Sequence, residues 1–127
     1  MARTWLLIGS IAGGLGVSGG AFGAHALKSQ LSDDMLAVFE TGTRYLLIHA
    51  VVLLLVGVLA QRSDARSLRV AGGAFSVGML IFTGTLWLLA ISGIRWLGAI
   101  TPIGGTALIV GWIALAVAAA RGQLDPS

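Results

Sequence analysis

Long stretches without a charged residue constrain this chain more than any other feature of its sequence. Residues 4–24, 70–94 and 96–120 contain no Asp, Glu, Lys or Arg and are mostly apolar. A helix that crosses the hydrocarbon core of a bilayer needs about 20 consecutive, mainly apolar residues, and each stretch meets that length. The sequence therefore predicts at least three membrane-spanning helices.

A fourth, shorter stretch covers residues 45–60 and is interrupted only by His49. It reaches spanning length if its helix begins upstream, and Ser32-Asp33-Asp34 provides N-capping side chains and negative charge for a helix start there. A helix over residues 33–60 would be about 42 Å long at about 1.5 Å per residue, so its first turns should lie in the headgroup region. We therefore expect four transmembrane helices.

The composition agrees with a membrane protein and excludes several other classes. Hydrophobic residues make up 57% of the 127 residues and charged residues only 10%, whereas soluble domains carry about 25% charged residues. High apolar content with a net charge of +3 excludes disorder. The chain has no cysteine, which excludes disulfides, thiolate metal sites and cysteine nucleophiles. The basic residues are scattered, so no nucleic-acid partner is expected.

The expected fold is a single all-α domain over residues 1–127, an integral membrane bundle with spans at about 4–26, 36–60, 70–91 and 102–120. Thr101 and Pro102 set the start of the last span, because threonine suits an N-cap and proline suits the first helical position. One longer helix kinked at Pro102 is the alternative. We favour the first interpretation, because Gly98, Gly104 and Gly105 weaken a continuous helix.

The distribution of basic residues predicts the orientation. Arginines and lysines near the ends of spans favour the cytoplasmic side. One side carries Arg3, Arg62, Arg66, Arg69 and Arg121, and the other carries Lys28, Arg44 and Arg95. Both termini should therefore be cytoplasmic.

The first span also has some features of a cleavable signal peptide, namely a basic start and a small-x-small site at residues 24–26. Its apolar run is longer than the 7–15 residues of a typical signal core, and it is rich in glycine. We therefore expect the segment to be retained as a transmembrane helix.

Glycines are frequent in the first span and around the start of the last span. Small residues let helix backbones approach closely in lipid, where association depends on van der Waals packing. Tight packing inside one bundle and a subunit interface are the two interpretations of this pattern. The candidate helix-packing residues are Gly9, Gly13, Gly16, Gly20, Gly23, Gly104 and Gly105.

Polar side chains within the spans should gather in the outer half of the membrane. Thr41, Tyr45 and His49 recur every four residues and so share one helical face, while Glu40 and Arg44 are spaced to form an ion pair. The candidate polar pocket consists of His25, Glu40, Thr41, Arg44, Tyr45, His49, Thr83, Thr85 and Thr101.

Two explanations compete for this polar layer. In the first, hydroxyls bond to helix carbonyls and His49 bonds to a neighbouring helix, so the layer only holds the bundle together. In the second, the layer lines a water-accessible pocket that binds a proton, an ion or a small polar molecule, with His49 as the titrating group.

The sequence contains no catalytic or metal-binding signature. His25 and His49 are far apart in the chain, with no HExxH motif and no cysteine, so no metal site is expected. Neither a phosphate-cradling loop nor a nucleophile with a matching base is present. We therefore expect no cofactor and no enzymatic activity.

Four ordered motifs resemble a known family. They are Gly20-Ala21-Phe22-Gly23-Ala24-His25, then Thr41-Gly42 followed by Tyr45 and His49, then Phe82-Thr83-Gly84-Thr85-Leu86, and last Thr101-Pro102-Ile103-Gly104-Gly105.

With these motifs the chain resembles, over nearly its whole length, the YgdD/YwdK-like family of small bacterial inner-membrane proteins, which is filed as domain of unknown function 423. The resemblance implies a four-span inner-membrane protein and supplies no activity, substrate or catalytic residue. Leu46 stands where relatives often carry glutamine, which weakens the case for a family-wide polar network there. The third span carries threonines where relatives are rich in serine, so its hydroxyls are kept.

Together these features favour a non-enzymatic accessory or scaffold component that acts through glycine-rich helix contacts. Its expected partners are membrane lipid and either further copies of itself or a larger membrane complex. The alternative is a small transporter, or a proton- or solute-responsive protein, that uses the polar pocket around His49.

Overall fold

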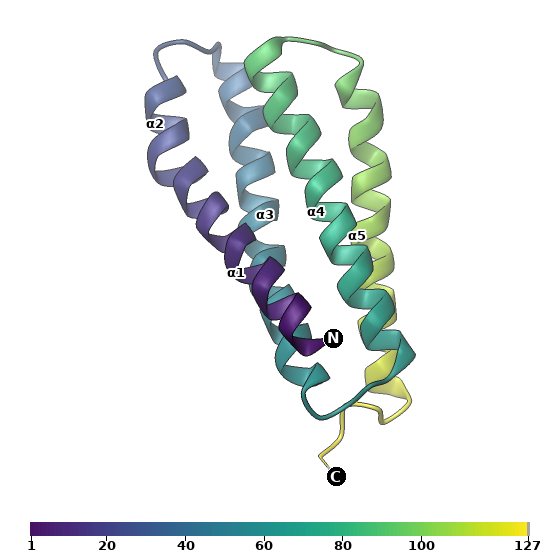
Figure 1. The fold of residues 1–127 in the computed structure, drawn as a ribbon. Coiled ribbons are helices and arrows are strands. Elements are labelled where there is room, and N and C mark those ends of the chain that lie inside the picture. Colours follow the sequence, from purple (N-terminus) through teal and green to yellow (C-terminus); the bar gives the residue numbers. More distant parts are fainter. Residues whose placement is uncertain (127) are drawn as a thin grey trace.

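The computed structural model describes residues 1–126, and all secondary structure within them is helical (Figure 1). Four helical segments there are long and apolar enough to cross a membrane, judged by length and composition. The predicted all-α fold with four transmembrane helices is therefore confirmed. The elements are α1 (Ala2–Ser18), the π-helical turn η1 (Gly19–Gly23), α2 (Ala24–Leu27), α3 (Asp33–Ala60), α4 (Arg66–Ser92) and α5 (Leu97–Ala120).

The four segments run alternately up and down, so the chain reverses direction at each connection (Figure 1). Both termini lie towards the end of the bundle that carries the 61–65 connection, and we call this the termini end. The 28–32 and 93–96 connections lie at the opposite end, which we call the far end. In the packing order, α1 lies against α3, α3 against α4, and α4 against α5.

The first span contains a π-helical turn, η1, that the sequence did not predict. Gly19 in this turn is buried, and a Cβ on it would lie 2.7 Å from the Trp87 ring and 3.4 Å from the Thr43 hydroxyl oxygen. A Cβ on Gly23 would lie 3.1 Å from the Phe39 ring. The missing side chains therefore let the first span approach both α3 and α4 closely near the far end.

The start of α3 agrees with the sequence-based expectation. Ser32 has extended backbone, and its hydroxyl oxygen accepts a hydrogen bond from the Met35 N–H at 3.2 Å. Asp33 and Asp34 place negative charge in the first turn, where it interacts favourably with the helix dipole. Local capping chemistry is therefore sufficient to fix this helix end.

The start of α5 corrects the favoured interpretation of the sequence. The helix begins at Leu97 and contains Pro102, so Thr101 is not its N-cap. Proline has no N–H, which leaves the Gly98 carbonyl without its usual helical donor. Packing compensates for this loss, because Leu97 and Thr101 are both buried and the Thr101 hydroxyl oxygen lies 2.7 Å from that of Thr85 on α4.

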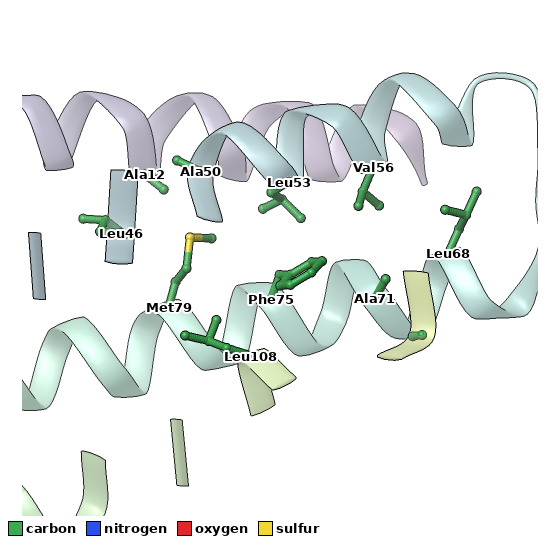
Figure 2. Close-up of a cluster of buried hydrophobic side chains, with 11 residues drawn as sticks. Ala12, Leu46, Ala50, Leu53, Val56, Leu68, Ala71, Phe75, Met79 and Leu108 are labelled. Atoms are coloured by element: carbon green, nitrogen blue, oxygen red, sulfur yellow. The ribbon is translucent and has the colours of Figure 1, made fainter. Parts of the chain in front are cut away.

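The apolar core lies between α3 and α4 and is completed by α1 and α5 (Figure 2). Leu53 and Val56 on α3 face Leu68 and Phe75 on α4, and these are the largest fully buried side chains. The remaining members of the cluster are Ala12, Leu46, Ala50, Ala71, Met79, Leu108 and Ala114. In lipid, close packing of this kind contributes most of the attraction between helices.

Glycines lie at the closest helix contacts. A Cβ on Gly9 would lie 3.0 Å from the Ala50 carbonyl oxygen, and a Cβ on Gly16 would lie 2.6 Å from the Leu47 side chain. On α5, a Cβ on Gly104 would lie 2.5 Å from the backbone nitrogen of Phe82. Residues larger than glycine would therefore push these helix pairs apart.

Candidate functional site

The polar side chains inside the bundle form three interhelical groups between the middle and the far end. The first joins α3 to α4 next to η1. The Trp87 indole N–H donates to the Thr43 hydroxyl oxygen at 3.0 Å, and the Thr43 hydroxyl donates to the Phe39 carbonyl at 3.0 Å. The Phe39 and Trp87 rings stack with centroids 5.2 Å apart. This group fixes the register of α3 against α4 beneath the glycines of η1.

Thr83 belongs to the same interface. Its side chain is buried, and its hydroxyl donates to the Gly42 carbonyl on α3 at 2.8 Å. That carbonyl is reachable because Gly42 has no side chain, and a Cβ there would lie 3.2 Å from Leu86. Thr83 therefore bonds to a neighbouring helix backbone and leaves no free hydroxyl proton.

The second group joins α4 to α5. The hydroxyl oxygens of Thr85 and Thr101 lie 2.7 Å apart, and both side chains are buried. The Thr85 oxygen also lies 2.7 Å from the Ile81 carbonyl oxygen, and the Thr101 oxygen lies 3.3 Å from that of Leu97. One hydroxyl can thus donate to the other while the second donates to its own helix.

The third group joins α3 to α5 at His49, about 18 Å along α3 from Gln61. The Trp112 indole N–H donates to His49 Nε2 at 3.1 Å, and His49 Nδ1 lies 2.7 Å from the Tyr45 carbonyl oxygen. Because an indole nitrogen only donates, Nε2 must be an acceptor and Nδ1 must carry the proton. This assignment follows from the bonding pattern and requires a neutral imidazole.

Aromatic rings surround this histidine. Its ring lies 5.7 Å from Phe75 and 5.9 Å from Trp112 between centroids, and it stacks on Tyr45 at 6.0 Å. Tyr45 in turn lies 4.5 Å from Phe82 on α4. His49 is only 5% exposed, so its environment within the described residues is aromatic and apolar.

Several residues of the predicted pocket are not brought into these groups. His25 on α2 is exposed, and the Thr41 hydroxyl donates to the Ala37 carbonyl of its own helix at 2.9 Å. Glu40 and Arg44 are both exposed, and no ion pair joins them in the part of the chain that the structure describes. The spacing of this pair therefore does not produce the expected contact.

Sequence reasoning missed several residues of these groups, among them Phe39, Gly42, Thr43, Trp87 and Trp112. The available signal was the indole N–H, because a tryptophan within a span needs a hydrogen-bond acceptor when it is buried. Sequence alone does not say which acceptor lies opposite. That choice depends on the rotation of each helix.

Two hollows lie away from His49. A groove of about 320 Å³ separates α1 from α4, and of the predicted pocket residues only Thr83 lines it. A second hollow of about 440 Å³ lies at the termini end, between Gln61-Arg62-Ser63 and Gln123-Leu124-Asp125. Neither is lined by His49. Within the described residues, no group of three His, Cys, Asp or Glu side chains is placed to hold a metal ion.

Four helices of spanning length, joined by short connections and polar contacts, define a small multi-pass membrane protein. The chain matches the family model described as "Protein of unknown function (DUF423)" over residues 19–105, a range that contains every residue of the predicted polar pocket. The protein belongs to this family.

Its relatives are also described as membrane proteins. The chain is 40% identical to the UPF0382 membrane protein YwdK of Bacillus subtilis over 94% of this chain and 98% of that protein. It is 39% identical to a UPF0382 membrane protein of Staphylococcus aureus over 91% of this chain and 94% of that protein, and 38% identical to one of Staphylococcus haemolyticus over 91% and 93%. No solved structure matches the chain.

Proposed function

We propose that this protein is a non-enzymatic accessory or scaffold component of the bacterial inner, or cytoplasmic, membrane. It acts through contacts between transmembrane helices, as a homo-oligomer or as a subunit of a larger membrane complex. Both termini lie in the cytoplasm, which is consistent with the arginines at the termini end, among them Arg3, Arg69 and Arg121.

One observation carries this proposal: the buried polar side chains bond to each other or to helix carbonyls. Among the described residues, the buried side-chain polar atoms without a partner are Trp5 Nε1 and Gln123 Oε1, and neither belongs to the three interhelical groups. A buried catalytic or transport site needs groups that are free to meet a substrate. We therefore assign the function to the lipid-facing helix surfaces.

The outer face of α1 is suited to a second helix. Ser10, Gly14 and Ser18 recur every four residues, all three are exposed, and nothing lies within 4 Å of a Cβ placed on Gly14. The two serine hydroxyls donate to their own helix, to the Leu6 carbonyl at 2.7 Å and the Gly14 carbonyl at 2.8 Å. The face is therefore shallow and free of unsatisfied donors, as close helix pairs in lipid require.

Oligomeric state after purification in a mild detergent tests the proposal. We expect the wild-type chain to elute as a homo-oligomer or with a stoichiometric partner, and Gly14→Leu to shift it to the monomer. Gly73→Leu is the matched control, because nothing lies within 4 Å of a Cβ on that glycine of α4 either. A monomeric wild-type chain without a partner contradicts the proposal.

A second candidate function, response to protons, is favoured by the His49–Trp112 bond. A protonated imidazole would present an N–H to the Trp112 N–H, so proton uptake must break this contact between α3 and α5. The test measures the pH dependence of proton flux into liposomes that contain the protein, with His49→Gln and His49→Phe compared with wild type. Flux that is unchanged in both variants eliminates this role.

A further inference from the structure

The hollow at the termini end lies where the last turn of α3 faces the segment that follows α5 (Figure 1). We call it the termini-end hollow, and its volume is about 440 Å³. Val58 and Leu59 of α3 and Leu124 form its apolar part, and the last two also belong to, or pack against, the interior of the bundle. Residues at the ends of spanning helices lie at the level of the lipid headgroups, so the hollow is placed where a headgroup meets the protein.

A local turn directs the segment after α5 back towards α3. Gly122 has a φ of +69°, a left-handed conformation that favours glycine. Its N–H donates to the Ala119 carbonyl at 3.0 Å, and the Gln123 N–H donates to the Ala118 carbonyl at 3.0 Å. This pair of bonds is the Schellman motif, which satisfies carbonyls of the last helical turn. The turn and the packing of Leu124 against the core fix residues 123–125 as one wall of the hollow.

Side chains of opposite charge line the two walls of the hollow. Arg62 and Ser63 lie on the wall next to α3, and Asp125 lies on the other wall. Both charged side chains are exposed, and neither forms an ion pair within residues 1–126. The Ser63 hydroxyl oxygen accepts a hydrogen bond from the Ala65 N–H at 3.3 Å, which leaves its own proton free to donate. One wall therefore offers donors to an anion, and the other offers a carboxylate to a cation.

Gln123 adds an acceptor to the wall that carries Asp125. This glutamine lines the hollow, and its Oε1 is buried without a hydrogen-bond partner among the described residues. A buried acceptor without a donor is costly, so binding of a group that supplies an N–H is favoured there. The second wall is therefore suited to a cation that carries N–H donors.

We propose that the termini-end hollow binds the headgroup of phosphatidylethanolamine, with its phosphate at Arg62 and Ser63 and its ammonium at Asp125. Guanidinium and hydroxyl groups donate to phosphate oxygens, and a primary ammonium donates up to three hydrogen bonds to carboxylate and amide oxygens. Val58 and Leu59 then contact the apolar part of the lipid next to the headgroup. The site uses none of the helix contacts on which the proposed function depends, so each proposal can fail without the other.

Other common phospholipids match only part of this lining. Phosphatidylcholine has the phosphate, but its trimethylammonium group has no N–H to donate to Asp125. Phosphatidylglycerol has the phosphate and no cation at all, which leaves the Asp125 carboxylate without a partner. The pattern of donors and acceptors in the hollow therefore selects a primary ammonium.

Native mass spectrometry of the full chain, released from micelles with equal amounts of these three lipids, tests the proposal. We expect one phosphatidylethanolamine per chain, retained about tenfold over each of the other two, as one charged hydrogen-bonded contact provides. Asp125→Asn should remove the preference over phosphatidylcholine, whereas Arg62→Gln should reduce retention of both lipids because both carry the phosphate. The matched controls are Asp64→Asn and Arg66→Gln, since both residues are exposed near the hollow without lining it; both should behave as wild type.

A measurement on the wild-type chain separates a lipid from a free headgroup and does not depend on the folding of any variant. Phosphatidylethanolamine should raise the melting temperature, whereas the same concentration of free phosphoethanolamine, which lacks the apolar part, should not. Equal stabilisation by the two would show that the site takes a soluble phosphate ester and would overturn the assignment to a lipid. Equal retention of phosphatidylethanolamine and phosphatidylcholine by the wild type, or an unchanged preference in Asp125→Asn, would overturn the proposed recognition of the ammonium.

Discussion

At Gly104 the absence of one methyl group determines how closely α4 and α5 approach. A Cβ there would lie 2.5 Å from the Phe82 backbone nitrogen, and backbone cannot move aside as a flexible side chain can. We therefore expect Gly104→Ala to lower the free energy of unfolding by about 1–3 kcal/mol, the usual cost of overpacking. Titration with a denaturing detergent, followed by circular dichroism, measures the change.

The neighbouring glycine provides the control for this substitution. A Cβ on Gly105 would lie 3.8 Å from the Phe82 ring, an ordinary van der Waals distance. Gly105→Ala carries the same change in helix propensity without the backbone contact, so it should leave stability unchanged or raise it slightly. Equal effects of the two alanines would show that propensity, rather than helix approach, governs this position.

The sequence shows which residues inside the spans are polar, but it does not show which of them are buried or what they bond to. Four members of the predicted polar pocket are buried and bond within or across helices, namely Thr83, Thr85, Thr101 and His49. Glu40 and Arg44, its charged members, are exposed. Burial depends on the rotation of each helix about its axis. Threonine is common on every side of a transmembrane helix, so hydropathy alone does not fix that rotation.

At the scale of whole elements, helix positions followed from hydropathy and capping, whereas two helix irregularities did not. The α3 helix begins at the predicted cap because Ser32 satisfies a backbone N–H locally. The π turn η1 and the early start of α5 depend on contacts with other helices, namely Trp87 against Gly19 and Thr85 against Thr101. Such contacts leave no local signal in the sequence.

Pro102 allows a test of this argument about α5. In Pro102→Ala the new N–H can donate to the Gly98 carbonyl, and the helix keeps its start at Leu97 because tertiary packing holds it. We expect the free energy of unfolding to rise by about 1 kcal/mol, the net value of one hydrogen bond. Pro126→Ala, outside the helices, is the control and should have no effect.

A fall in stability for Pro102→Ala would mean that the rigid proline ring stabilises this part of α5 by more than the restored hydrogen bond does. Thermal melting of both variants in the same detergent decides between the two explanations.

At the scale of the whole molecule, the interior and the surface have different roles. The interior is occupied by close glycine contacts and by polar side chains that bond to one another. The lipid-facing side carries the outer face of α1 and the groove between α1 and α4. This division of roles agrees with the proposed function, in which the protein acts through contacts between transmembrane helices.

The arginines at the termini end predict which end of the bundle faces the cytoplasm. Arg62, Arg66 and Arg69 lie in or next to the 61–65 connection, whereas Lys28 and Arg95 lie at the far end. The positive-inside rule therefore predicts that the 61–65 connection lies in the cytoplasm.

The chain contains no cysteine, so single exposed cysteines can report on each end without background. In intact cells, a membrane-impermeant maleimide should label Ser29→Cys at the far end and leave Gln61→Cys unlabelled until the membrane is permeabilised. The reverse pattern would place both termini outside. Labelling of both positions in intact cells would indicate a mixed topology and contradict a single orientation.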